Sequence, residues 1–122
     1  MKQFPRTAAI LYFLFFSILL QAQRTAFYTD RDQQFKQGLE LFDKKQYASA
    51  QKVFSEYRRT VSASSPLAAD AEYYAAACGI ELFNKDSEWL MRQFIAHNPS
   101  SSKLNSAYFY LASSNFRKKK IR

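Results

Sequence analysis

Apolar residues recur three or four positions apart along most of the chain, which is the period of an amphipathic α-helix. In the clearest case, Tyr47, Ala50, Phe54, Tyr57 and Val61 follow one another at spacings of 3, 4, 3 and 4. The pattern predicts five helices, at about 30–45, 47–61, 66–83, 87–97 and from about 102 onward, and no strand. Connections of about two residues join the first helix to the second and the third to the fourth, so we expect two antiparallel hairpins followed by a single helix.

The third predicted helix differs from the others because it is apolar nearly all round, so we expect it to be the most buried. Pro66 stands at its first position, which suits proline, and Ser65 before it is the expected N-cap.

One seven-residue phrase occurs twice with nearly the same spelling: GLELFDK at 38–44 and GIELFNK at 79–85, 41 residues apart. Self-similarity at such a period predicts a repeat architecture, in which each phrase ends the first helix of a hairpin. Glycine inside a helix costs about 1 kcal/mol relative to alanine, so we expect Gly38 and Gly79 where a neighbouring helix approaches closely. A weaker third copy, ASSNFRK at 112–118, has Ala112 in the place of the glycine.

The phased residues resemble the tetratricopeptide repeat, a helical hairpin of about 34 residues. Gly38, Tyr47, Ala50 and Phe54 follow the spacing of 9, 3 and 4 that is typical of that family, while the second copy keeps Gly79 and Phe94. The phrase FIAHNPSSSKLNSAYFYLA is similar to repeats of periplasmic, cell-envelope members. The family's early Trp is absent from every copy, and the resemblance covers about residues 29–118.

The resemblance implies an all-α fold in which hairpins stack as a short right-handed solenoid of about two and a half repeats. Its units would be 29–65, 66–101 and a partial third, 102–122. Either the chain is the N-terminal part of a longer array, whose remaining repeats would cover Phe109 and Phe116, or the last helix caps the array.

The function that the resemblance implies is a non-catalytic scaffold for protein–protein interaction. In this family the first helix of each hairpin lines a concave groove that holds a segment of a partner. The groove positions here would be Phe35, Leu39, Phe42, Tyr73, Ile80, Phe83, Phe109 and Phe116. The packing positions would be Gly38, Tyr47, Ala50, Phe54, Gly79, Phe94 and Ala112. Such a groove would take an apolar peptide or helix face, unless these residues pack within the array instead.

The N-terminal segment, 1–22, has the pattern of a secretory signal peptide. A basic start precedes 13 residues without charge, AAILYFLFFSILL at 8–20, and Ala22 follows at the expected cut. A transmembrane anchor is the alternative, but a span needs about 20 apolar residues. A linker, 23–28, would follow the cut, and because the only cysteine is Cys78, a lipoprotein anchor is excluded. We therefore expect export to the periplasm or the outer membrane.

The net charge of +8 is concentrated at the ends of the chain. Two of the 18 cations lie in the signal segment, and five more are Arg117, Lys118, Lys119, Lys120 and Arg122. The remaining body is nearly neutral, which argues against nucleic-acid binding, since that function spreads cations along a face. The basic end favours an alternative function: a module that touches anionic lipid or lipopolysaccharide phosphates at the membrane surface.

Little in the sequence points to catalysis or to a cofactor. With one His and one Cys, no His/Cys metal cluster can form, and no glycine-rich phosphate loop or metalloprotease motif occurs. We expect Cys78 to be a small buried hydrophobe and His97, near a helix end, to satisfy terminal carbonyls. The sequence therefore predicts a protein that is not an enzyme and holds no cofactor.

Overall fold

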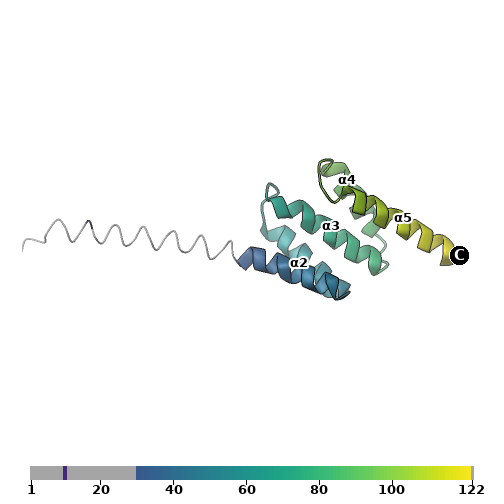
Figure 1. Ribbon diagram of the computed structural model, residues 1–122, viewed down its shortest axis with the longest axis horizontal. Helices are drawn as coiled ribbons and strands as arrows, with labels where there is room; N and C mark the ends of the chain where they lie inside the picture. The colour runs from purple at the N-terminus through teal and green to yellow at the C-terminus, as the bar shows by residue number, and fades with distance from the viewer. Residues whose placement is uncertain (1–9, 11–29, 122) are drawn as a thin grey trace, which may run out of the picture. The chain divides into compact units, whose positions relative to one another are not determined.

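The computed structural model describes residue 10 and residues 30–121 (Figure 1). Within 30–121 every regular element is an α-helix: one over 30–43, then α2 (Tyr47–Thr60), α3 (Pro66–Glu81), α4 (Ser87–His97) and α5 (Leu104–Ile121). The prediction of an all-α fold is confirmed for this part of the chain. The predicted signal peptide, 1–22, and linker, 23–28, lie outside the described residues apart from position 10.

Helix α3 lies at the centre of the unit formed by residues 34–121, between α2 on one side and α4 and α5 on the other (Figure 1). Its middle carries small residues. The side chains of Ala76, Ala77, Cys78 and Ile80 are each at most 2% exposed. Small side chains let neighbouring helices approach from several directions, which explains why a helix apolar nearly all round is the most buried one. That prediction from the sequence is confirmed.

Two clusters of buried side chains form the core, one on each side of α3. The first comprises Phe35, Ala50, Phe54, Tyr57, Ala71 and Cys78. The second comprises Tyr73, Ala76, Ala77, Ile80, Met91, Phe94, Ala107 and Leu111. Phe42 and Tyr74 pack against both clusters. The Tyr74 ring stacks on Phe54 at 5.0 Å and meets Phe42 edge-on at 5.1 Å, so the core is continuous across α3.

The helix over 30–43 ends in a Schellman motif, the tight turn in which one residue takes the left-handed conformation. That residue is Lys45, with φ of 58°. The Gln46 amide donates to the Leu41 carbonyl, and the Lys45 amide donates to the Phe42 carbonyl, both at 2.9 Å. The chain then reverses directly into α2.

Helix α3 ends in the same motif, but three residues earlier in the repeated phrase. The left-handed residue is Phe83, with φ of 59°. The Asn84 amide donates to the Gly79 carbonyl at 2.9 Å, and the Phe83 amide donates to the Ile80 carbonyl at 3.2 Å. Lys45 and Phe83 are 38 positions apart, whereas the two phrases are 41 apart. The two phrases therefore do not end their helices at the same letter: the first helix ends at 43 and α3 at Glu81, each about two residues before the predicted ends at 45 and 83.

Both glycines lie at close contacts between helices. A Cβ added to Gly38 would come within 2.7 Å of the Phe54 ring in α2. A Cβ added to Gly79 would overlap the Ser87 hydroxyl at the start of α4 and lie 2.9 Å from Gln51 Nε2 in α2. Neither position has room for a side chain in this packing.

Two further details of the sequence-based prediction need correction. Ser65 occupies the N-cap position before Pro66, but its hydroxyl makes no capping hydrogen bond. The third copy of the phrase, at 112–118, ends no helix, because α5 runs through it to Ile121. Ala112 is exposed there, and Ser114 is the buried residue instead, since the face of α5 that meets α4 carries Ala107, Leu111 and Ser114.

Candidate functional site

The side chains predicted to line a groove lie in two different environments. Phe35, Tyr73 and Ile80 are only 6%, 5% and 2% exposed, and Leu39 and Phe42 are partly buried against the first core cluster. Phe83, Phe109 and Phe116 are 65%, 69% and 70% exposed. Phe35 and Ile80 are thus core residues, because the apolar stripe of each first helix faces its neighbours within the unit.

One hollow brings two of the predicted groove residues together, and we call it the α3–α5 hollow. It measures about 590 Å³ and is lined by Tyr73, Glu81, Asn105, Ser106, Phe109, Tyr110, Ser113 and Arg117. Its residues come from one face of α3 and the facing side of α5, whose serines at 106 and 113 leave space between the larger rings. A volume of this size suits one or two large side chains of a ligand.

Aromatic rings form one side of the α3–α5 hollow. The Tyr110 ring centroid lies 6.1 Å from that of Tyr73 and 6.4 Å from that of Phe109. Burial raises the pKa of both Tyr73 and Tyr110, so their hydroxyls stay protonated and can donate hydrogen bonds. The rings therefore offer an apolar surface with neutral polar edges.

The opposite end of the α3–α5 hollow carries an ion pair. Arg117 Nη1 donates to Glu81 Oε2 at 3.2 Å, which links α5 to the end of α3. The guanidinium carbon also lies 5.2 Å from the centroid of the Phe83 ring. The hollow therefore has two charged groups at this end, and their charges cancel.

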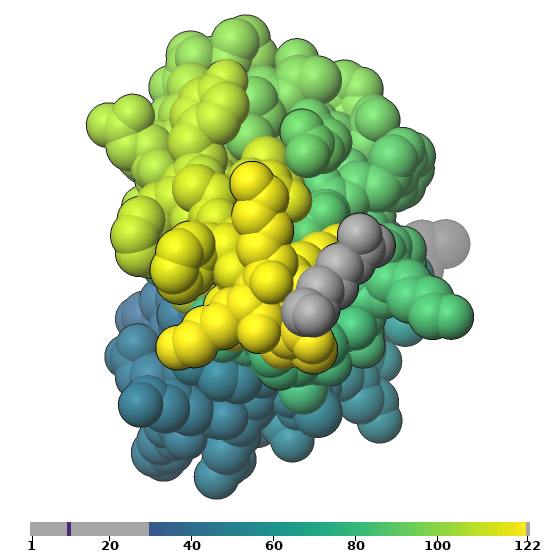
Figure 2. Space-filling view, turned by 90° about the vertical axis from the view of Figure 1, so that its right-hand side faces the viewer, coloured from purple at the N-terminus to yellow at the C-terminus, as the bar shows by residue number. Residues whose placement is uncertain are grey.

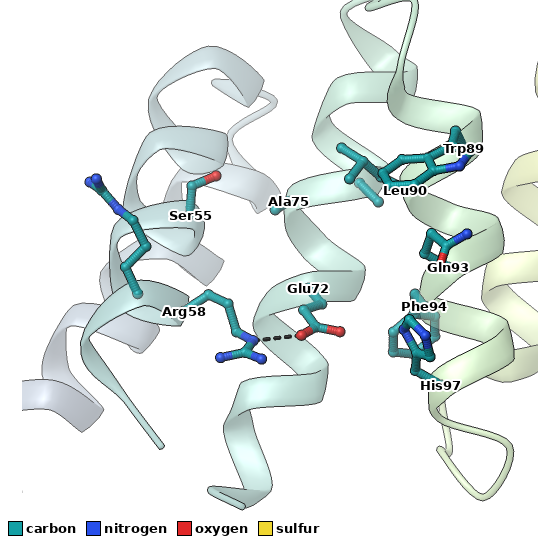
Figure 3. A pocket seen from close by; sticks show the side chains of 11 residues that line it. Ser55, Arg58, Glu72, Ala75, Trp89, Leu90, Gln93, Phe94 and His97 are labelled. Carbon is teal, nitrogen blue, oxygen red and sulfur yellow. Dashed lines mark hydrogen bonds and ion pairs between the residues drawn. The ribbon is translucent and has the colours of Figure 1, made fainter. Parts of the chain in front are cut away.

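A second hollow, the α2–α4 groove, crosses α3 on another face (Figure 3). It measures about 440 Å³ and is lined by Ser55, Arg58, Arg59, Glu72, Ala75, Ala76, Trp89, Leu90, Gln93, Phe94 and His97. Helices α2 and α4 both pack on α3 and not on each other. The groove exists because the floor between them consists of Ala75 and Ala76, which are too small to fill the gap.

The sequence did not single out the α2–α4 groove. Trp89 lines this groove and is 60% exposed. The one signal that could have indicated the groove is that Trp89 stands next to Leu90 and Phe94, which already share one face of the helix without it. His97 also lines the groove, and the terminal carbonyl of Phe94 is bound by the side chain of Asn98 at 3.0 Å. The prediction that His97 serves that end is therefore wrong.

The predicted packing positions are mostly in the interior. Gly38, Ala50, Phe54, Gly79 and Phe94 are buried, Tyr47 is half-buried and Ala112 is exposed. Ala112 is the exception because its side of α5 meets no neighbouring helix of the described unit.

Residues 30–121 contain neither a metal-binding cluster nor an accessible thiol. No group of three or more His, Cys, Asp and Glu side chains in that part of the chain could hold a metal ion. Cys78 is fully buried, and burial raises the pKa of its thiol to about 12. None of the described helices is both long and apolar enough to span a bilayer.

No protein-family model matches the chain, and comparison with curated proteins and with solved structures finds no significant match.

Proposed function

We propose that the protein is an exported, non-catalytic helical-repeat scaffold of the tetratricopeptide-repeat type, which binds an apolar segment of a protein partner in the cell envelope. Support for the repeat type comes from two successive hairpins whose closing turns have the same hydrogen bonds 38 positions apart, close to the family's period of about 34. The partner would lie in the α3–α5 hollow and along the adjoining rings of α5.

The observation that carries the proposal is the exposure of Phe109 and Phe116, at 69% and 70%. The two residues are seven positions apart, so they lie on one face of α5, beside the hollow that Phe109 lines. A cluster of exposed aromatic side chains is typical of a surface that binds a partner, and aromatic residues are enriched at protein interfaces. The same face could be covered either by a further helix of a longer array or by a segment of another protein.

Site-specific photocrosslinking in the producing cell tests this function. We expect a photoreactive phenylalanine analogue at position 109 or 116 to form discrete adducts with one common partner, identified by mass spectrometry. The control position is Glu56, which is exposed on α2 away from the hollow. Absence of adducts at 109 and 116 in the folded protein, or equal adducts at all three positions, would contradict the proposal. A crosslinked peptide from the same chain would identify further repeats as the occupant.

The alternative function, contact with anionic lipid or lipopolysaccharide, uses the basic end of α5, which stands at the surface (Figure 2). Two of its cations already have intramolecular partners: Arg117 pairs with Glu81, and Lys118 Nζ lies 2.9 Å from Glu88 Oε1. Lys119 and Lys120 are exposed. Binding to anionic liposomes that disappears in Lys119→Glu/Lys120→Glu and at high salt would favour this alternative.

A further inference from the structure

The α2–α4 groove is a second hollow of the described unit, formed by residues other than those of α5. We propose that this groove binds an amphipathic helix of a protein partner whose apolar face is flanked by an acidic side chain. The groove shares no lining residue with the α3–α5 hollow, so the proposal stands independently of the function proposed above.

The α4 wall supplies the apolar contact. Trp89 is 60% exposed and Leu90 is 37% exposed, while Phe94 below them is buried. The labelled side chains follow one another down the side of α4 that borders the groove (Figure 3). An exposed tryptophan at the edge of an alanine-floored groove is the residue type that most often dominates a protein interface once a partner removes it from water.

The dimensions of the groove suit a helix rather than a flat surface. The α4 wall extends from Trp89 to His97, which is about 12 Å at the helical rise of about 1.5 Å per residue. A partner helix would cover that length with about two turns and would place side chains at i, i+4 and i+7 along it. A volume of about 440 Å³ accommodates two or three such apolar side chains.

The charge of the opposite wall selects the partner. Arg58 Nε donates to Glu72 Oε1 at 2.5 Å, an ion pair that joins α2 to α3 and cancels both charges (Figure 3). Arg59 also lines the groove, is exposed, and lies outside that ion pair. The lining therefore has one more arginine than it has carboxylates, and a carboxylate on the incoming helix would complement it.

The same charge argues against a second copy of this chain as the occupant. The exposed apolar face of α5, which carries Phe109 and Phe116, is a helix face of a second copy that could enter such a groove. It is followed directly by Lys118, Lys119 and Lys120, which would approach Arg59 with like charge.

The groove contains its own spectroscopic probe, because Trp89 is the only tryptophan in the chain. The test uses two synthetic 14-residue helical peptides without tryptophan, which carry leucines at i, i+4 and i+7. One has glutamates beside the leucines and the other has lysines. We expect the glutamate peptide to shift Trp89 emission to the blue, saturably, and to protect it from acrylamide. The lysine peptide should bind at least about tenfold more weakly, a difference that shrinks in high salt.

Three variants control the experiment. Arg59→Glu should reverse the preference between the two peptides, and Leu90→Ser should weaken both. Phe109→Ser alters only the α3–α5 hollow and should change neither, and circular dichroism verifies that each variant is folded. Equal affinity of the two peptides, saturable binding without a change in Trp89 emission, or an unaltered preference in Arg59→Glu would overturn the proposal. A concentration-dependent blue shift of the protein alone, with a dimer in sedimentation velocity, would identify a second copy as the occupant and would also overturn it.

Discussion

At the scale of single residues, Gly79 lies where α3 passes so close to Ser87 of α4 that an added Cβ would overlap the serine hydroxyl. The Ser87 side chain is 1% exposed, and among the described residues its hydroxyl has no hydrogen-bond partner. A buried hydroxyl without a partner loses its hydration and gains nothing in exchange. The serine is tolerated because its small size lets α3 and α4 meet at a glycine.

We expect Gly79→Ala to lower the free energy of unfolding by about 2 kcal/mol, because the new methyl group overlaps Ser87 Oγ. Ser87→Ala alone should be neutral or slightly stabilising, since it removes an unsatisfied polar group. In the Ser87→Ala background, Gly79→Ala should cost at least about 1 kcal/mol less, as measured by urea unfolding.

The matched control for this pair of substitutions is Gly38→Ala, made in the wild-type and in the Ser87→Ala background. Its added methyl group meets the Phe54 ring and not Ser87, so its cost should be the same in both backgrounds. Additive effects of Gly79→Ala and Ser87→Ala would show that the two positions do not share the strain.

At the scale of helices, Glu88 of α4 makes two polar contacts with α5, in addition to the apolar contacts of the core. Ser114 Oγ donates to Glu88 Oε1 at 2.5 Å, and Lys118 Nζ lies 2.9 Å from the same oxygen. The hydrogen bond from Ser114 and then that from Lys118 hold the pKa of Glu88 below its ordinary value of 4.5. The stabilisation is therefore fully present above that ordinary value and is lost as the pH falls through the lower pKa of the folded state.

We expect Ser114→Ala to raise the pKa of Glu88 toward its ordinary value, because it removes the largest cause of the lowering. The loss of stability on acidification should become smaller in the variant, since the folded and unfolded pKa values of Glu88 approach each other. Carboxyl NMR titration measures the pKa directly. Ser113→Ala, which changes the neighbouring serine on the α3–α5 hollow, should leave the titration of Glu88 unchanged; an equal shift in both variants would contradict the assignment.

Also at this scale, the sequence predicted which segments are helical, and it placed the ends of the first and third helices about two residues late. The apolar period identified the helices, and α4 begins and ends where the pattern placed it. The left-handed position of each closing turn is held by Lys45 or Phe83 and not by glycine, so the usual sequence signal for a helix end is missing at both turns. The repeated phrase does not replace that signal, because its copies are 41 residues apart and the two turns are 38 apart.

The groove prediction had a related weakness. A helical period identifies which residues share a face, but it does not say whether that face meets a neighbour or solvent. Phe35 and Phe109 have the same residue type at comparable positions in their helices, yet one is 6% and the other 69% exposed. They differ because α2 packs against the first helix and covers Phe35, whereas no helix of the described unit covers the side of α5 that carries Phe109.

At the scale of the whole described unit, α3 belongs to both core clusters. Tyr74 contacts both clusters, and Lys103, just before α5, donates to the Tyr74 hydroxyl at 3.2 Å. Because α3 supplies residues to both clusters, neither cluster is complete without it. The hairpins should therefore not unfold separately.

We expect residues 34–121 to unfold in a single transition, with the slowest amide hydrogen exchange in the middle of α3, from Ala76 to Ile80. Exchange there should require global unfolding, because these residues are buried from all sides. The last turn of α5, which carries Lys118 to Lys120, should exchange fastest among the helices. Exchange measured by mass spectrometry, with fluorescence and circular dichroism as separate probes, checks both expectations. Two transitions, or a first hairpin that stays protected while α3 exchanges, would contradict them.

The burial of Cys78 has a practical consequence for work on this protein in solution. Maleimides and other thiol reagents attack the thiolate, and a side chain with no exposed surface and a pKa of about 12 presents none in the folded state. A cysteine introduced on the surface can thus carry a dye or a spin label selectively, with the native sequence otherwise intact. Modification of Cys78 itself would then count the molecules whose core has opened.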